Sequence, residues 1–259
     1  MTDVTEDAFL GGRVMITQPK RGYRAGIDAV FLAASAPCRP GARVLDVGAG
    51  VGTVGLCLAA RVHDVEVVLL EREAELAALA RGNIEANKLS DRVRVVNAAI
   101  EASAEVFAAA GLKPDSFDVV LANPPFHAEG RGTPAPDPLK AASHAMAEAS
   151  LDTWVRFLAR MAKPGGFASM IHKAEALPEV LAAFTGRFGD IRVRPMHPRA
   201  GEAAIRVIVQ GTKGSRAPLV LLAGYNLHGE GNAFTEGAQM VLRDGAGSPL
   251  VTQEDVRRL

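Results

Sequence analysis

The sequence predicts an α/β fold in which an open, mostly parallel sheet carries helices on both faces. Three stretches indicate this fold. A strand that begins at Arg43 ends in Gly48-Ala-Gly-Val-Gly52 and is followed by an apolar helix. A second strand over 65–70 ends on Glu71, and a third over 117–122 runs into Asn123-Pro-Pro-Phe126. In such a sheet the carboxyl ends of the strands face the crevice that binds ligands, so these stretches also predict the functional site.

Length and composition fit one domain over residues 1–259, with a hairpin and helix extension over 1–36, a core over 37–222 and an irregular tail over 223–259. The formal net charge is +0, so a nucleic-acid surface has to be local. The two cysteines do not form a disulfide framework, and the six histidines lack metal-ligand spacing, so we expect no metal. The acidic first residues lack the apolar run of a secretory signal, and no membrane span is evident, so we expect a cytoplasmic protein.

The remaining elements follow from hydrophobic periodicity and from the Gly and Pro breaks. A hairpin over 9–16 turns at Gly11-Gly12, and a helix covers 26–36. The Gly/Pro-rich stretch 127–144 directly follows the third strand and predicts a substrate lid. Further helices are expected over 53–60, 74–87, 101–110, 151–161 and 178–184, and further strands over 92–97, 167–171, 191–194, 204–210 and 219–222.

The glycine loop predicts a nucleoside cofactor. Gly48, Gly50 and Gly52 allow a sharp turn and a close approach of the backbone to a ligand. The spacing is not the Gly-x-Gly-x-x-Gly of dinucleotide sites, which disfavours a pyrophosphate. Glu71 lies some 20 residues further on, where it can accept hydrogen bonds from both ribose hydroxyls. It could instead be an acid at the start of the next helix.

The turn Asn123-Pro-Pro-Phe126 suits a planar substrate that carries an amino group. The Asn123 side-chain oxygen and the Pro124 carbonyl can both accept hydrogen bonds from one NH₂ group, and Phe126 offers a face for stacking. An ordinary proline-rich turn is the alternative.

The segment from Arg187 to Arg216 is rich in cations. This local excess would let a neutral protein bind a polyanion through phosphate contacts, although arginine is also common on solvated sheet edges. We expect Trp154 to be a packing or interface residue and His172 a structural histidine. The candidate substrate-binding residues are His127, Arg194, Arg199, Arg206, Lys213 and Arg216.

Several motifs together resemble the class I S-adenosylmethionine-dependent methyltransferases, and within them the TrmN6-like family. The motifs are the lead-in 18–33 with Gly26-Ile-Asp28, the glycine loop, Asn123-Pro-Pro-Phe126, His197-Pro-Arg199 with Arg206, and Lys213-Gly-Ser-Arg-Ala-Pro218. The resemblance implies a Rossmann-like, seven-stranded sheet with one antiparallel strand. It also implies methyl transfer from S-adenosylmethionine to an exocyclic base amine of RNA, foremost N6 of adenine in tRNA.

By the same resemblance, Asn123, Pro124, Pro125 and Phe126 are the catalytic residues. The residues expected to bind the cofactor are Asp46, Gly48, Gly50 and Gly52 at its methionine end, Glu71 at its ribose, and Tyr23, Asp28 and Asn123.

Other features leave alternatives open. Ala99 stands where many relatives carry an acid that contacts the cofactor's adenine. Asn123-Pro-Pro-Phe126 followed by His127 also resembles the guanine-N2 methyltransferases of ribosomal RNA, and a related motif occurs in the glutamine-N5 methyltransferases of release factors. A non-catalytic RNA-binding module with this fold is the contrasting interpretation.

Overall fold

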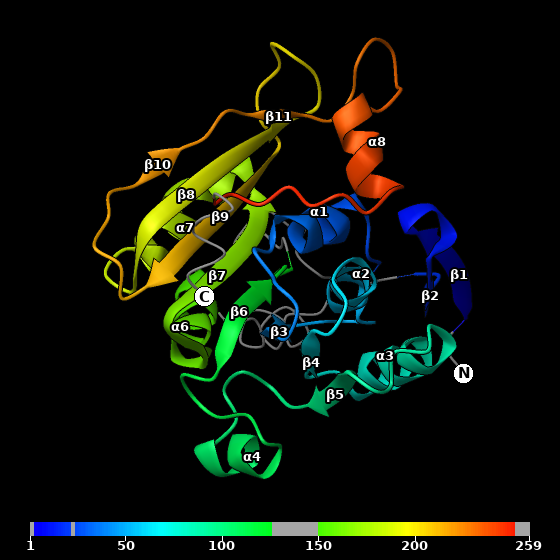
Figure 1. Cartoon of the computed structure of the whole chain (residues 1–259), viewed down its shortest axis with the longest axis vertical. Coiled ribbons are helices and arrows are strands. Elements are labelled where there is room, and N and C mark those ends of the chain that lie inside the picture. The colour runs from blue at the N-terminus through cyan, green and yellow to red at the C-terminus, as the bar shows by residue number, and fades with distance from the viewer. Residues whose placement is uncertain (1–2, 22–23, 126–149, 252–259) are drawn as a thin grey trace, which may run out of the picture.

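A computed structural model of the chain describes residues 3–21, 24–125 and 150–251. Its main sheet has the strand order β10-β8-β9-β7-β6-β3-β4-β5, and β11 also pairs with β8 (Figure 1). The strands are β3 (Arg43–Val47), β4 (Glu66–Glu71), β5 (Val93–Asn97), β6 (Phe117–Ala122), β7 (Ala162–Lys173), β8 (Phe188–His197), β9 (Arg206–Lys213), β10 (Val220–Leu221) and β11 (Tyr225–Asn226).

The expected mostly parallel sheet with one antiparallel strand is confirmed. β9 pairs antiparallel with both β7 and β8, and the other pairs in the sheet are parallel. The strand count differs from the prediction, since the described sheet has nine strands and not seven. β10 lies within the strand expected over 219–222, whereas β11 was not expected. Both are two residues long and lie along the outer edge of β8, where the chain returns after β9.

Helices cover both faces of the sheet, as predicted. Alternate side chains of a strand point to opposite faces, so Val44 of β3 belongs to one apolar cluster and Leu45 to the other. The first cluster packs against α1 (Ile27–Ser35), α2 (Thr53–Arg61) and α3 (Ala74–Ala86), and the second against α4 (Ala104–Ala109), α6 (Leu151–Met161) and α7 (Leu177–Phe184).

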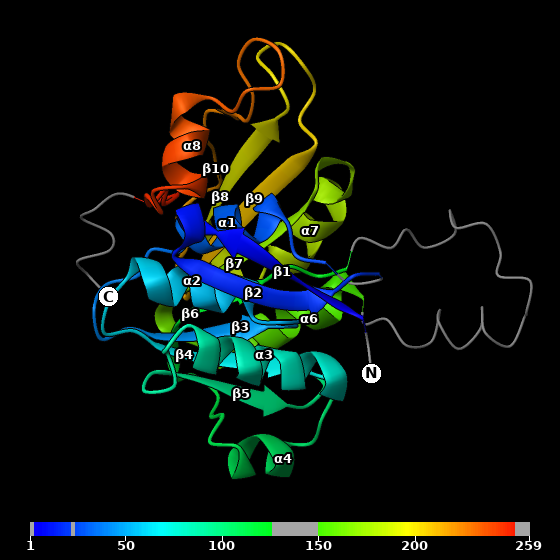
Figure 2. The same ribbon diagram turned by 90° about the vertical axis from the view of Figure 1, so that its right-hand side faces the viewer.

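The N-terminal hairpin forms a separate two-stranded sheet beside α2 and α3 (Figure 2). β1 (Val4–Phe9) and β2 (Val14–Pro19) are joined by a 3-10 turn over Leu10–Gly12, as the Gly11-Gly12 pair predicts. Two asparagines of α3 and its C-cap bind the backbone of β2: the amides of Thr17 and Met15 donate to Oδ1 of Asn83 (2.8 Å) and of Asn87 (2.9 Å). These bonds satisfy backbone groups on the free edge of the hairpin.

Three boundaries were predicted wrongly. The tail over 223–259 is not irregular in its described part, because it contains β11 and α8 (Glu236–Leu242), and α8 packs against α1 (Figure 1). The strands β8 and β7 are longer than the strands expected over 191–194 and 167–171. The expected helix over 101–110 is shortened to α4. Within the described residues, no helix has the length and apolarity needed to cross a membrane.

Candidate functional site

The three sequence motifs meet at one end of the sheet. Val47, the last residue of β3, pairs with Leu70 of β4 on one side and with Ala122 of β6 on the other. Gly48, Glu71 and Asn123 directly follow these three residues, so they are neighbours at the carboxyl ends of adjacent strands. Strands in a sheet lie about 4.8 Å apart, which brings the glycine loop and Asn123 within reach of one small ligand.

The glycine loop adopts the backbone conformation that the sequence predicts. Gly48, Gly50 and Gly52 have φ values of 68°, 56° and 90°, in the left-handed region that glycine alone adopts easily. The amides of Gly48 and Ala49 both donate to the carbonyl oxygen of Leu70, at 2.8 and 3.0 Å. The loop is therefore fixed to β4, and α2 begins directly after it at Thr53.

The carboxylate of Glu71 is hydrogen-bonded to the glycine loop. The residue is 5% exposed, and its two carboxylate oxygens accept hydrogen bonds from the amides of Gly50 (2.7 Å) and Glu73 (2.8 Å). The bond from Glu73 lies at the N-cap of α3, so the alternative role of an acid at a helix start is also realised. Each carboxylate oxygen can accept a second hydrogen bond, so the predicted contact with a ribose is compatible with this arrangement.

Asp46 is a second buried acid, and it lies in β3 two residues before Gly48. It is 1% exposed, and its Oδ2 accepts a hydrogen bond from the amide of Gly55 in α2 at 3.0 Å. Burial raises the pKa of Asp46 to about 7, against the lowering effect of the Gly55 amide, and the nearby Glu71 carboxylate raises it further. Asp46 therefore stabilises the turn between β3 and α2 and changes its charge near neutral pH.

Asn123 presents an unused acceptor. Its Oδ1 is buried, and the described residues offer it no hydrogen-bond partner. Pro124 is buried and Pro125 is exposed, so the turn leaves the sheet with its first residues fixed. A buried polar atom without a partner is costly, and such atoms often mark the place of a ligand. The predicted site residues Phe126, His127 and Tyr23 lie outside the described residues, as does the stretch 127–144 predicted to be a substrate lid.

Trp154 also lies at this site, although the sequence predicts only a packing or interface role for it. A Cβ atom built on Gly48 would lie 2.4 Å from Cη2 of Trp154, so the indole contacts the glycine loop directly. Trp154 comes from the first turn of α6, the first described helix after the Asn-Pro-Pro turn in the chain. That position was the one signal in the sequence that could have placed it here.

Comparisons with known proteins agree with this geometry. The family model described as methyltransferase small domain matches residues 26–149. The chain is 33% identical over 125 residues to a tRNA1(Val) (adenine(37)-N6)-methyltransferase of Klebsiella pneumoniae, covering 48% of this chain and 49% of the relative. It is similarly related to the Bacteroides thetaiotaomicron protein of the same name, with 34% identity, 44% coverage of this chain and 46% of the relative.

A solved structure covers far more of the chain. It is described as a predicted O-methyltransferase from Agrobacterium tumefaciens, and it is 32% identical with a TM-score of 0.72 over 86% of this chain and 98% of that one. The chain belongs to the same family of methyltransferases as this Agrobacterium protein. It nevertheless spans only about half the length of the curated tRNA methyltransferases that it matches.

The candidate RNA-binding cations of this methyltransferase mostly bind oxygen atoms of the protein itself. Arg206 forms an ion pair with Asp28 at 2.8 Å, which joins two residues predicted for substrate and cofactor binding. Lys213 pairs with Asp115 and donates to the carbonyl oxygen of Ala162 at 2.9 Å. These contacts hold the sheet and its neighbouring loops together.

Two further candidate cations differ in exposure. Arg199 donates to the carbonyl oxygen of Gly231 at 2.9 Å and to Oδ1 of Asn232 at 2.9 Å, which fixes one loop to another. Arg216 is exposed and forms no ion pair with the part of the chain that the structure describes. Whether these residues bind substrate stays a prediction.

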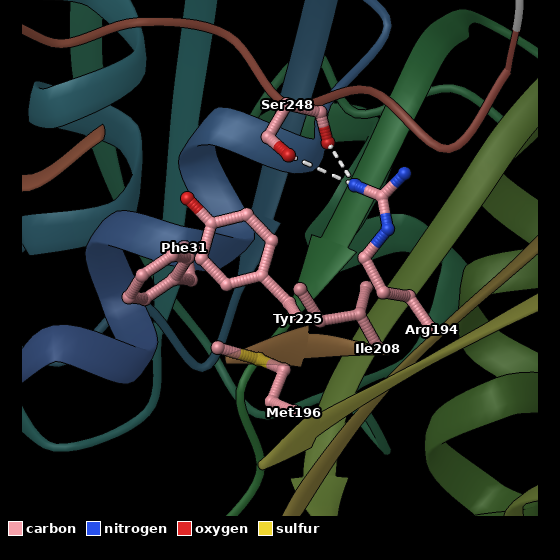
Figure 3. Close-up of a pocket in the computed structure, with 6 residues that line it drawn as sticks. All are labelled: Phe31, Arg194, Met196, Ile208, Tyr225 and Ser248. Carbon is pink, nitrogen blue, oxygen red and sulfur yellow. Dashed lines mark hydrogen bonds between the residues drawn. The ribbon is translucent and has the colours of Figure 1, made fainter. Parts of the chain in front are cut away.

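Arg194 fastens the C-terminal segment to the sheet. Its guanidinium donates to the backbone and side-chain oxygens of Ser248 at 2.7 and 2.9 Å, beside the Tyr225 ring (Figure 3). Burial lowers the pKa of Arg194 and raises the pKa of Tyr225. The ring of Tyr225 packs edge-on against Phe31 of α1, with 5.3 Å between centroids. These side chains, which enclose the narrow space in Figure 3, connect the sheet with α1 and with the C-terminal segment.

Proposed function

We propose that this protein is an S-adenosylmethionine-dependent methyltransferase that methylates an exocyclic base amine of RNA, foremost N6 of adenine in tRNA. The observation that supports this most directly is the buried Oδ1 of Asn123, which lacks a partner among the described residues. It lies one strand away from the glycine loop, so an acceptor for a substrate amine adjoins the predicted cofactor site.

The residues present fit the cofactor. The left-handed glycines lack a Cβ atom, so the backbone of the loop can lie close to a ligand. The helix α2 begins directly after the loop, and its N-terminus favours the cofactor's carboxylate. Each carboxylate oxygen of Glu71 keeps a free lone pair for a ribose hydroxyl, and Asp46 binds the amide of Gly55 in the helix that follows the loop. S-adenosylmethionine, when bound, supplies the activated methyl group.

The residues of the chain would act by orienting the amine. An aromatic amine is a weak nucleophile, because its lone pair is delocalised into the ring. If Oδ1 of Asn123 and the carbonyl oxygen of Pro124 each accept one N–H bond, they favour the pyramidal geometry in which the lone pair leaves the ring plane. Phe126 is proposed to stack on the base, as its type and position predict. No covalent intermediate with the protein is required.

The two hydrogen-bond acceptors, Oδ1 of Asn123 and the carbonyl oxygen of Pro124, distinguish between an amine and a hydroxyl as the group that receives the methyl. An amine carries two hydrogens and satisfies both oxygens, whereas a hydroxyl carries one and leaves an acceptor unpaired. The pair therefore favours N-methylation over the O-methylation for which the Agrobacterium protein is described. Two further amine substrates, N2 of guanine in ribosomal RNA and a glutamine side chain, satisfy the same acceptors and are alternative outcomes of the test.

The substrate class is taken from the relatives and from the remaining basic surface. The curated relatives are named for adenine 37 of tRNA1(Val), and we propose tRNA as the partner on that basis. The exposed Arg216 and the partly exposed Arg199 are the cations we propose for phosphate contacts. A single methyltransferase domain over residues 1–259 that acts in the cytoplasm is part of the same proposal.

The test is a methylation assay with total RNA from cells that lack this enzyme. Purified protein is incubated with labelled S-adenosylmethionine, and the nucleosides of each RNA fraction are analysed by mass spectrometry. We expect N6-methyladenosine in the tRNA fraction. N2-methylguanosine in ribosomal RNA would show that the target is guanine N2 and not adenine N6. Cofactor binding without any RNA methylation would redirect the search to proteins and small molecules, and absence of cofactor binding would favour the non-catalytic RNA-binding module.

A further inference from the structure

Trp154 stands out in the candidate site because it is in contact with the glycine loop but comes from a helix that the site motifs do not include. It packs against the apolar cluster that contains Val47 and Ala122, the last residues of β3 and β6. Gly48 and Asn123 follow these two residues directly. The indole therefore lies at the boundary between the predicted cofactor loop and the predicted substrate turn.

The contact with Gly48 is too close for any side chain at that position. A Cβ atom there would lie 2.4 Å from Cη2 and 2.9 Å from Cζ3 of Trp154, distances that van der Waals contacts do not allow. Gly48 thus meets two demands at once, a φ of 68° and direct contact with an aromatic ring. The ring occupies the space on the side of Gly48 where other residues would place their side chain.

Packing alone does not account for Trp154. The side chains that α6 buries in the core are Val155, Phe157, Leu158 and Met161. Trp154 is only partly buried, so a portion of its surface remains available for contact with a ligand. The methionine end of S-adenosylmethionine carries two cationic groups, and an indole is the side chain that attracts a nearby cation most strongly through its ring.

We infer that the indole of Trp154 is a wall of the cofactor site and contacts the methionine end of the bound cofactor. The inference rests on the proposed function, since it takes S-adenosylmethionine or its product as the ligand. It adds a residue from α6 to a site that the sequence motifs assign to the strand ends alone.

The protein contains one tryptophan, so its emission reports this position directly. We expect S-adenosylhomocysteine to change the emission of Trp154 in a saturable way and to protect it from quenching by acrylamide. Titration calorimetry on the same samples measures binding independently. Binding heat with unchanged emission and unchanged quenching would overturn the role of Trp154 alone. No binding heat would overturn the proposed cofactor and the inference with it.

Variants separate a ligand contact from a structural effect. Trp154→Ala should weaken S-adenosylhomocysteine binding about tenfold, whereas Trp154→Phe, which keeps an aromatic ring, should lose less. Phe157→Leu is the matched control, because Phe157 is buried in the same helix against Phe107, with 5.3 Å between ring centroids. It should lower thermal stability and leave the affinity unchanged. Equal affinity of Trp154→Ala and wild type, or equal weakening by Phe157→Leu, would contradict the inference.

Discussion

The carboxyl ends of β3, β4 and β6 and the basic segment from Arg187 to Arg216 are both functional candidates by sequence. They differ in whether the fold already satisfies their polar groups. At the strand ends, Oδ1 of Asn123 is buried without a partner among the described residues. In the basic segment, Arg194, Arg206 and Lys213 are bound to oxygens of the protein itself. A count of charges therefore overstates a binding surface, whereas an unsatisfied buried acceptor points to a ligand.

The largest expected effect comes from Asn123→Ala. Removal of the free acceptor should lower the rate of methyl transfer to RNA by roughly 10²–10³-fold, the size seen when one preorganised hydrogen-bond partner of a transition state is lost. Cofactor affinity, measured by calorimetry, should stay nearly unchanged. A parallel loss of cofactor affinity would assign Asn123 to cofactor binding. Its free acceptor would then no longer indicate a substrate site.

Arg206→Ala tests whether the basic segment is structural. Its side chain and that of Asp28 are 26% and 18% exposed, so loss of the ion pair leaves a mostly buried carboxylate unpaired. We expect the free energy of unfolding to fall by about 1–3 kcal/mol in urea denaturation. An unchanged stability together with weaker RNA binding would instead make Arg206 a substrate contact.

Arg216→Ala is the matched variant for this comparison, because Arg216 lies in the same segment but is exposed. Its stability should stay within roughly 0.5 kcal/mol of wild type. If Arg216 contacts a phosphate, RNA binding should weaken for all sequences, and the salt slope of binding should fall by about 1. The two arginine variants would then show opposite patterns of stability and RNA binding.

The last prediction concerns Asp46 and the pH dependence of stability. Its pKa is about 7 in the folded chain and about 3.9 in an unfolded one, so between these values only the folded state keeps the proton. The contribution of Asp46 to the free energy of unfolding should therefore decrease as pH rises from about 4 to 7, by at most about 1.4 kcal/mol per pH unit, and level off above 7. Asp46→Asn stays neutral and should lack this slope. Identical pH profiles of the two proteins in urea denaturation would contradict the shifted pKa.

Local patterns in the sequence were sufficient for much of the fold. Period-two apolar strands and 3.6-period helices predicted the sheet with helices on both faces, and Gly11-Gly12 predicted the hairpin turn. The tail was predicted wrongly because α8 has only seven residues, and so short a helix forms by packing on α1 and not by its own propensity. The edge strand β11, of two residues, was likewise missed, because it is defined only by its pairing with β8.

The chemistry that the strand ends carry could be predicted from short stretches of sequence. The left-handed glycines, Glu71 at the end of β4 and the proline-fixed turn after β6 depend on the conformations of a few consecutive residues, which are local properties. The contact of Trp154 with Gly48 and the pairing of Asp28 with Arg206 became visible only in the folded chain. Such contacts join residues far apart in the chain, because a long side chain meets whichever element the packing of helices on the sheet brings beside it.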